Sequence, residues 1–151
     1  IMKRGKLNPK TSFLVPVLLA VWLLGGCETT QLSPAEQEAL DAERAARAEI
    51  MVGDWEGEIS DEDKSYPVVF HIRTDRNGVL YATMDSPSQG VYGFGVDRTR
   101  FDGTTLTFEI REARFTYEGA ISSDGQTVTG VFEQAGHSGE TSLSKVPGTG
   151  M

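Results

Sequence analysis

The sequence predicts an all-β fold: a small antiparallel meander barrel of about eight strands, preceded by one N-terminal helix. From residue 53 onward, apolar and polar residues alternate with a period of two, as in strands with one buried face. Asn-Gly and Asp-Gly dipeptides separate these runs, and both central positions of a type I′ hairpin turn favour such residues. Glycines within the runs indicate sharp bends, which favours a closed barrel over a sandwich.

Residues 1–26 are expected to be a signal peptide. The segment carries four Lys and Arg residues and no acid before the apolar run "TSFLVPVLLAVWLL". A basic segment, a short apolar run and small residues before a cleavage site are typical of export signals. The run is shorter than the roughly 20 residues of a membrane-spanning helix.

The stretch "LLGGC", which ends at Cys27, resembles the lipobox of bacterial lipoproteins. The resemblance implies cleavage before Cys27 and modification by fatty acyl chains such as palmitate, which would anchor the chain stably to a lipid bilayer. Glu28 rather than Asp follows the cysteine, which by the sorting habit of Gram-negative lipoproteins implies the periplasmic face of the outer membrane over the inner membrane. A plain secretory signal with a chance cysteine, or an uncleaved anchor, remains the alternative.

The charge of the chain restricts its partners. Without the four basic residues of the signal, ten basic residues stand against 22 acids, a net charge of −12. Such a surface argues against nucleic acid and anionic lipid surfaces as partners. We expect a small apolar ligand or an envelope protein instead. Cys27 is the only cysteine in the sequence, so no disulfide within the chain is expected.

Residues 27–32 are predicted to be a lipidated tether and residues 33–51 a helical spacer. Ser33, Pro34 and Glu36 form a capping-box pattern at the start of a segment rich in Ala, Glu and Arg. About 18 helical residues would reach roughly 27 Å. The thin apolar stripe leaves open that the helix instead packs on the barrel or on a partner.

Residues 53–147 are predicted to form the barrel and residues 148–151 a C-terminal tail. The turns are expected at Asn77-Gly78, Asp102-Gly103, Asp124-Gly125 and residues 136–139. A barrel of eight strands either fills with side chains or holds one small ligand. Large aromatic residues that point inward by phase form either a packed core or the walls of a cavity, with Gln89 at its mouth. The expected lining residues are Trp55, Phe70, Phe108, Tyr117, Phe132 and Gln89.

Two motifs carry a family resemblance. Gly53-Asp54-Trp55 resembles the G-x-W start of lipocalins. Residues 53–146, including "ATMDSPSQG" at 82–90, are similar to the small lipocalin-like barrel ahead of the α/β-hydrolase domain in some exported bacterial serine hydrolases. The resemblance implies a fold and an exported location, and it carries no hydrolase activity to this chain.

We expect no enzyme activity, no cofactor and no metal site. Ser88 lies one residue short of a G-x-S-x-G nucleophile elbow, but the glycine-rich stretch behind it does not predict the helix that an elbow requires. His71 and His137 are the two histidines, and their separation matches no metal-ligand spacing. The acidic run at residues 60–64 lacks the 12-residue loop of an EF-hand and is expected to be a solvated hairpin tip.

The leading hypothesis is a membrane-anchored lipoprotein whose non-catalytic barrel binds a small apolar ligand or a protein segment. The alternative is a structural or interaction lipoprotein of the cell envelope. Its barrel would be filled, and its surface or helix would contact a partner.

Overall fold

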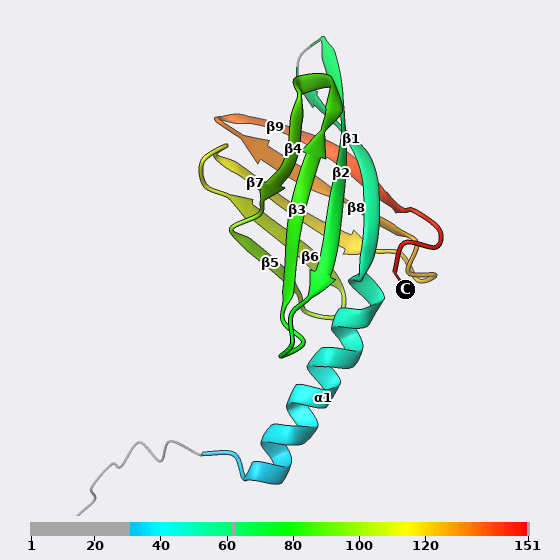
Figure 1. Ribbon diagram of the computed structural model, residues 1–151. Coiled ribbons are helices and arrows are strands. Elements are labelled where there is room, and N and C mark those ends of the chain that lie inside the picture. The colour runs from blue at the N-terminus through cyan, green and yellow to red at the C-terminus, as the bar shows by residue number, and fades with distance from the viewer. Residues whose placement is uncertain (1–30, 62, 151) are drawn as a thin grey trace, which may run out of the picture. The chain divides into compact units, whose positions relative to one another are not determined.

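The computed structural model describes residues 31–61 and 63–150, and it confirms the all-β fold with a preceding helix (Figure 1). The predicted signal peptide and Cys27 lie outside the described residues. Helix α1 spans Pro34–Met51. The nine strands are β1 Gly53–Asp61, β2 Lys64–Thr74, β3 Leu80–Ser86, β4 Val91–Gly95, β5 Arg98–Phe101, β6 Thr105–Ile110, β7 Phe115–Ile121, β8 Thr127–Gln134 and β9 His137–Lys145.

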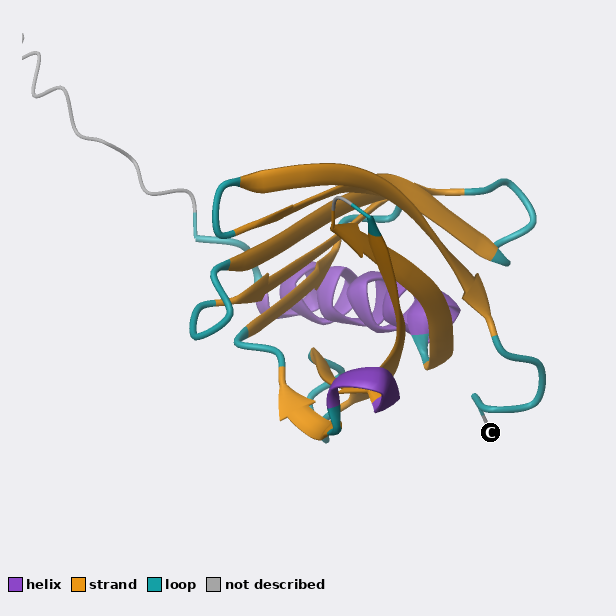
Figure 2. Cartoon of the chain, turned by 90° about the horizontal axis from the view of Figure 1, so that it is seen from above, coloured by secondary structure: helices purple, strands orange, loops and turns teal. Residues whose placement is uncertain are grey.

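The strands form one antiparallel sheet in the order β4-β3-β2-β1-β9-β8-β7-β6-β5. The order is that of a meander, except that β1 pairs with β9 and so joins the two halves of the chain. The sheet curls around the interior, as the view from above shows (Figure 2). The two edge strands of the sheet are β4 and β5. The short connection between them includes Val96, whose N–H donates to Ala82 O of β3 at 3.0 Å. The barrel is therefore curled and open at one seam.

The hairpin turns follow the predicted dipeptides. Gly78, Gly103 and Gly125 all have positive φ, as the tight turns require. The predicted turn at residues 136–139 is shorter than expected. Gln134 pairs with His137, and only Ala135 and Gly136, both with positive φ, lie between them.

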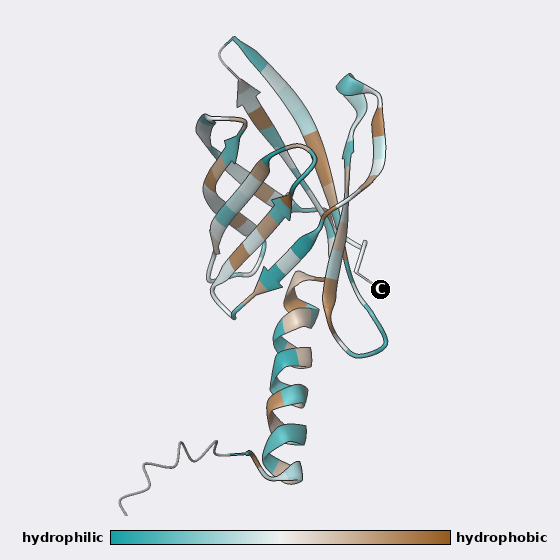
Figure 3. Ribbon diagram, turned by 90° about the vertical axis from the view of Figure 1, so that its left-hand side faces the viewer, coloured by the Kyte–Doolittle hydropathy of each residue, from teal (hydrophilic) through white to brown (hydrophobic). Residues whose placement is uncertain are grey.

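The capping box of α1 is present. Ser33 Oγ accepts from Glu36 N–H at 3.3 Å, and the Ser33 N–H donates to Glu36 Oε2 at 2.8 Å. The helix surface is exposed and mostly hydrophilic (Figure 3), and only Ala48 and Met51 are buried. The helix therefore contacts the barrel by its last turns, while its N-terminal half projects into solvent.

The C-terminal end of α1 is attached to the barrel by polar contacts. Trp55 Nε1 donates to Met51 O at 2.9 Å, and Lys145 Nζ donates to Ile50 O at 2.8 Å. Burial lowers the pKa of Lys145, against the attraction of Glu49. Its ammonium group also lies 5.5 Å from the centre of the Trp55 ring, at a distance at which a cation and an aromatic face attract. These contacts close the end of the barrel beside α1.

The predicted C-terminal tail is also attached, as far as the structure describes it. Thr149 Oγ1 accepts from the Asp54 N–H at 2.9 Å and donates to Val146 O at 2.8 Å. The tail thus continues the contact between the end of the chain and β1.

Aromatic rings fill the middle of the barrel. The rings of Phe70 and Phe108 stack with centroids 4.4 Å apart, and Phe108 lies 6.1 Å from Tyr117. Tyr117 is buried, and its hydroxyl donates to Val128 O at 3.1 Å, which satisfies a polar group in an apolar interior. Stacked rings in van der Waals contact leave no calyx at this level of the barrel.

Candidate functional site

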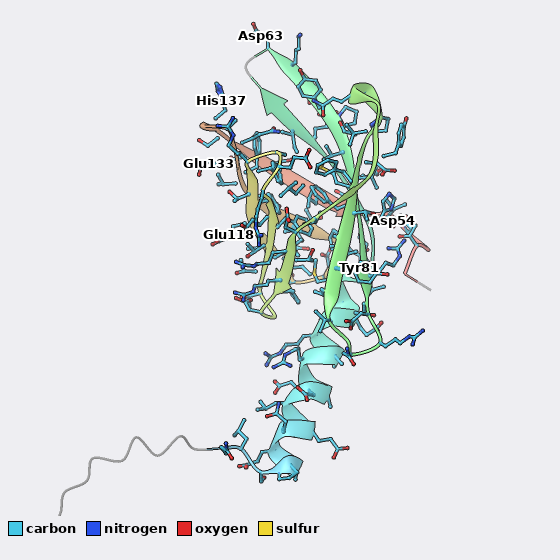
Figure 4. The ribbon with its side chains drawn as sticks, turned by 60° about the vertical axis from the view of Figure 1, so that its left-hand side comes forward. Asp54, Asp63, Tyr81, Glu118, Glu133 and His137 are labelled. Carbon is cyan, nitrogen blue, oxygen red and sulfur yellow. The ribbon has the colours of Figure 1, made fainter. Side chains whose placement is uncertain are left out.

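A cavity of about 230 Å³ lies at the end of the barrel remote from α1. Ile59, near the end of β1, lines it, whereas α1 joins the beginning of β1 at Gly53. Strands rise about 3.3 Å per residue, so the cavity and the helix lie at opposite ends of this strand. His137, which also lines the cavity, lies at the upper end in Figure 4, away from α1.

The cavity is lined by apolar and polar side chains, and polar groups make up the larger share of the surface that it exposes. Strands β1, β2, β3, β6, β7, β8 and β9 all contribute, because each presents alternate residues to the interior. The larger apolar side chains of the wall are Ile59, Val68, Met84, Ile110, Phe115 and Phe132. The polar members of the lining are Tyr66, Gln89, Gln134 and His137. Small-molecule sites usually combine apolar side chains with a small number of polar groups, and this lining contains both.

The floor of the cavity is the aromatic core. Phe115 and Phe132 have ring centroids 6.2 Å apart, and Phe115 lies 6.3 Å from Phe70 in the filled centre. The packed rings limit the depth of the cavity. A ligand therefore has room at the remote end only and cannot extend through the barrel.

The residues that the sequence predicted to line a cavity fall into two groups in the structure. Phe132 and Gln89 line the cavity. The other four pack in the closed core, where each is at most 1% exposed: Trp55, Phe70, Phe108 and Tyr117. For these four, the alternative of a packed core describes the structure. The alternation along a strand identifies which residues point inward, but it does not give their position along the barrel axis. That position decides whether an inward residue lies in the packed core or lines the cavity.

The segment after β3 shapes one side of the rim. Pro87–Gln89 form a short 3₁₀ turn, η1, which ends at Gly90 in the left-handed region with φ of 69°. Ser86 is fully buried, and its Oγ donates to Gln89 Oε1 at 2.9 Å, with Pro67 O at 3.4 Å. Ser88 is exposed on η1, and strand β4 rather than a helix follows it. The segment holds Gln89 at the cavity and lacks the arrangement of a nucleophile elbow.

A second polar cluster lies on the outer face of β1, β2 and β3. His71 Nδ1 lies 2.9 Å from Asp54 Oδ1 and Nε2 lies 3.2 Å from Asp85 Oδ2, while Arg73 Nη2 donates to Asp54 Oδ1 at 2.8 Å. Asp85 Oδ1 also accepts from Gly93 N–H at 2.6 Å, which ties β4 to β3. Both ring nitrogens of His71 are occupied by carboxylates, so the cluster serves as a charged brace between strands.

The pKa values of this cluster shift in the directions that pairing requires. Partial burial opposes the charge of His71, but the hydrogen bonds with Asp54 and Asp85 outweigh it and raise the pKa of the imidazole. Burial likewise opposes ionisation of Asp54, and the bonds from His71 and Arg73 outweigh it and lower its pKa. The pKa of Asp85 is lowered, first by the Gly93 N–H and then by His71. Sequence reasoning considered His71 as a metal ligand with His137, and the strand register reveals its carboxylate partners.

Residues 31–61 and 63–150 contain neither a metal-binding cluster nor a membrane-spanning helix. Within these ranges, no group of three or more His, Cys, Asp or Glu residues is arranged to hold a metal ion. In the same part of the chain, no helix combines the length and apolar character needed to cross a membrane.

Comparisons with known proteins add no assignment. No profile of a known protein family matches the chain, and no curated protein sequence is significantly similar to it.

Proposed function

We propose that the chain is a membrane-anchored lipoprotein whose barrel, without catalysing a reaction, binds a small apolar ligand. The observation that carries the proposal is the cavity of about 230 Å³, to which seven strands contribute and which apolar side chains line in part. An apolar cavity of about 150 Å³ already suffices to bind benzene in another protein, so this volume is large enough for a small guest.

The filled core sets the size of the ligand. A water molecule takes up about 30 Å³ of the liquid, so the cavity has the volume of roughly eight water molecules and suits a guest of about that many non-hydrogen atoms. Burying such a molecule removes its apolar surface from water, worth about 0.8 kcal/mol per CH₂ group. A short aliphatic chain or a single ring fits these limits, whereas a long fatty acid does not.

The direction of α1 supports the role of the helix as a spacer. The N-terminal half of α1 is exposed, and its last turn is bonded to the closed end of the barrel through Trp55 and Lys145. The tether and Cys27 precede the free end of this helix in the chain. An acylated Cys27 would thus hold the barrel by its closed end, with the cavity at the other end, open to the periplasm.

Methionine methyl groups provide a direct test of binding. Met84 lines the cavity, whereas Met51 is buried at the junction with α1. The full chain, labelled with [methyl-¹³C]methionine and held in phosphatidylcholine nanodiscs, is titrated with benzene. We expect a saturable shift of the Met84 methyl signal and no saturable shift of the Met51 signal.

A variant that fills the cavity is the matched control. Ala113 lines the cavity from the turn between β6 and β7, and Ala113→Phe places a ring in the free space. The Met84 response to benzene should disappear in this variant, while Met51 keeps its reference position. A linear shift of Met84 that is equal in both proteins would reflect partition of benzene into the lipid and would refute a binding cavity.

The lipid anchor is tested separately. Cys27→Ser removes the thiol that would be acylated, so this variant should lose the mass of the acyl chains. It should also fail to be cleaved before residue 27. Intact-mass spectrometry of the membrane fraction distinguishes the forms. If the wild-type chain is neither acylated nor cleaved, its mass differs from that of Cys27→Ser only by the substitution. That result would show an ordinary membrane anchor instead.

A second candidate function is contact with an envelope protein, without a ligand. A crevice of about 320 Å³ between α1 and the barrel is lined by Arg44 and Ala48 of the helix and by Val79 and Phe101. Val79 is 54% exposed there. A photo-crosslinking residue at position 79 should form a discrete protein adduct in native membranes if this function holds. The equally exposed Val131 on β8 is the control position.

A further inference from the structure

The orientation of the Gln89 amide restricts what it can offer a ligand. Its Oε1 accepts a hydrogen bond from Ser86 Oγ at 2.9 Å. Ser86 is 0% exposed, whereas Gln89 is exposed, so the bond is anchored on its buried serine side and open to water on the other. Oε1 is turned toward Ser86, and the Nε2 group of the same amide, which donates and does not accept, remains for a ligand.

The charge of the lining restricts the ligand further. Of the described residues that line the cavity, none carries a carboxylate, an ammonium or a guanidinium group. A charged group that enters an apolar site without a partner of opposite charge loses its hydration without compensation. The excess of 22 acidic over 14 basic residues adds a long-range field that disfavours anions. The cavity therefore suits a neutral molecule.

We propose that the ligand is a neutral amphiphile with a hydrogen-bond-accepting carbonyl group, such as a short ketone or ester. Its oxygen accepts from Gln89 Nε2 at the rim, and its hydrocarbon chain packs against Met84 and Phe132. Ser86 acts as a positioning residue, because its hydroxyl holds the amide with the donor available. This inference rests on the proposed function and adds the class of ligand and the residue that selects it.

Probes of equal size test the selection. 2-Heptanone, hexanoate and heptylammonium each contain about eight non-hydrogen atoms, which matches the cavity. Each is titrated into the labelled full chain in nanodiscs at pH 7, and the Kd is read from the Met84 methyl shift, with benzene as the reference. We expect 2-heptanone to bind about tenfold or more tightly than either ion, because only the ions lose uncompensated hydration.

Substitution of Gln89 tests its role as donor. Gln89→Glu replaces the donor by a carboxylate, so 2-heptanone should bind about five- to tenfold more weakly, as expected for one lost hydrogen bond. Heptylammonium should bind more tightly to the same variant. Gln126→Glu adds the same charge in the exposed β7–β8 turn and should change neither affinity. Ser86→Ala, which releases the amide, should weaken 2-heptanone less than Gln89→Glu does.

The outcomes separate the two proposals. Equal affinities for 2-heptanone and the two ions would overturn the proposed selection of a neutral ligand. Unchanged binding of 2-heptanone to Gln89→Glu would overturn it as well. In either case, saturable binding of benzene would still support a binding cavity. If neither benzene nor 2-heptanone shifts Met84 in a saturable way, the proposed function itself is refuted.

Discussion

The indole Nε1 of Trp55 donates to the main-chain oxygen of Met51 at 2.9 Å, and this bond joins the last turn of α1 to the first strand of the barrel. Both residues are fully buried, so water cannot replace the bond. Trp55 belongs to the G-x-W pattern, and its position at the closed end explains why a large side chain with one donor is suitable there. The same contact fixes the direction in which the helix leaves the barrel.

Trp55→Phe tests this junction. The variant loses the donor, leaves the Met51 oxygen unpaired and creates a small void. We expect the free energy of unfolding to fall by about 2–4 kcal/mol. Urea denaturation followed by circular dichroism measures the change. Tyr92→Phe, at a side chain that is 67% exposed, should change the stability by less than about 0.5 kcal/mol. An equal effect of the two substitutions would refute the structural role of the Trp55 bond.

A glycine on β8 tests the packing of the curled sheet. A Cβ at Gly130 would overlap Glu118 O and Gly119 Cα of the neighbouring strand, and backbone atoms cannot rotate away. Gly130→Ala should therefore destabilise the protein by about 3 kcal/mol or prevent folding. At Gly95 a Cβ meets nothing within 4 Å, so Gly95→Ala should be nearly neutral in the same denaturation experiment. If Gly130→Ala folds with wild-type stability, the backbones of β7 and β8 do not approach each other as closely at Gly130 as the structure shows.

The charged brace of β1, β2 and β3 predicts a dependence of stability on pH. The pKa of His71 is raised above its ordinary value of 6.5, so its contribution is complete below pH 6.5 and disappears as pH rises through the higher folded pKa. The pKa values of Asp54 and Asp85 are lowered from 3.8, so their contribution is present above pH 3.8 and disappears as pH falls through the folded values.

His71→Gln isolates this contribution. The difference in free energy of unfolding between wild type and variant should be greatest between pH 3.8 and 6.5 and should shrink on either side. Because His71 is partly exposed, the maximum should be on the order of 1 kcal/mol. Urea denaturation at intervals from pH 3 to 9 measures the difference. A difference in free energy of unfolding that grows from pH 6.5 to 9 would contradict a raised pKa of His71.

The free N-terminal half of α1 predicts a local effect of its cap. Ser33→Ala removes the side chain that accepts from Glu36 N–H, worth about 1 kcal/mol to a helix terminus. The first turns should fray and helical content should fall, while the melting temperature of the barrel stays unchanged because these turns contact no core residue. Circular dichroism at 222 nm and a thermal melt measure both quantities. A lower melting temperature would indicate that this half of the helix packs on the barrel.

Much of the fold followed from local sequence patterns. Period-two alternation identified the strands, the Asn-Gly and Asp-Gly dipeptides identified three turns, and the capping box identified the start of α1. Each of these signals depends on neighbouring residues, so one sequence suffices to read it. The short edge strands β4 and β5 were not predicted individually, because Gly93 and Gly95 interrupt β4 and the four residues of β5 are too few for a clear alternation.

The candidate site was less accessible to sequence reasoning. Gln89 and Phe132 were identified as lining residues, but Trp55 and Phe70 have the same inward phase and lie in the packed core. The contact of His71 with Asp54 and Asp85 depends on cross-strand register, which the chain order does not reveal. The hydrogen bond between Ser86 and Gln89 was also missed, because the spacing of a serine and a glutamine does not show how their side chains are oriented.

The most direct test of the central claim is an intermolecular NOE measurement on the full chain in nanodiscs with benzene. Met84 lines the cavity and Met51 lies at the closed end, so their methyl groups report on two separate places in one sample. A guest in the cavity predicts NOEs from the benzene protons to the Met84 methyl group and none to Met51. Absence of any NOE to Met84 at saturating benzene would contradict a ligand-binding barrel.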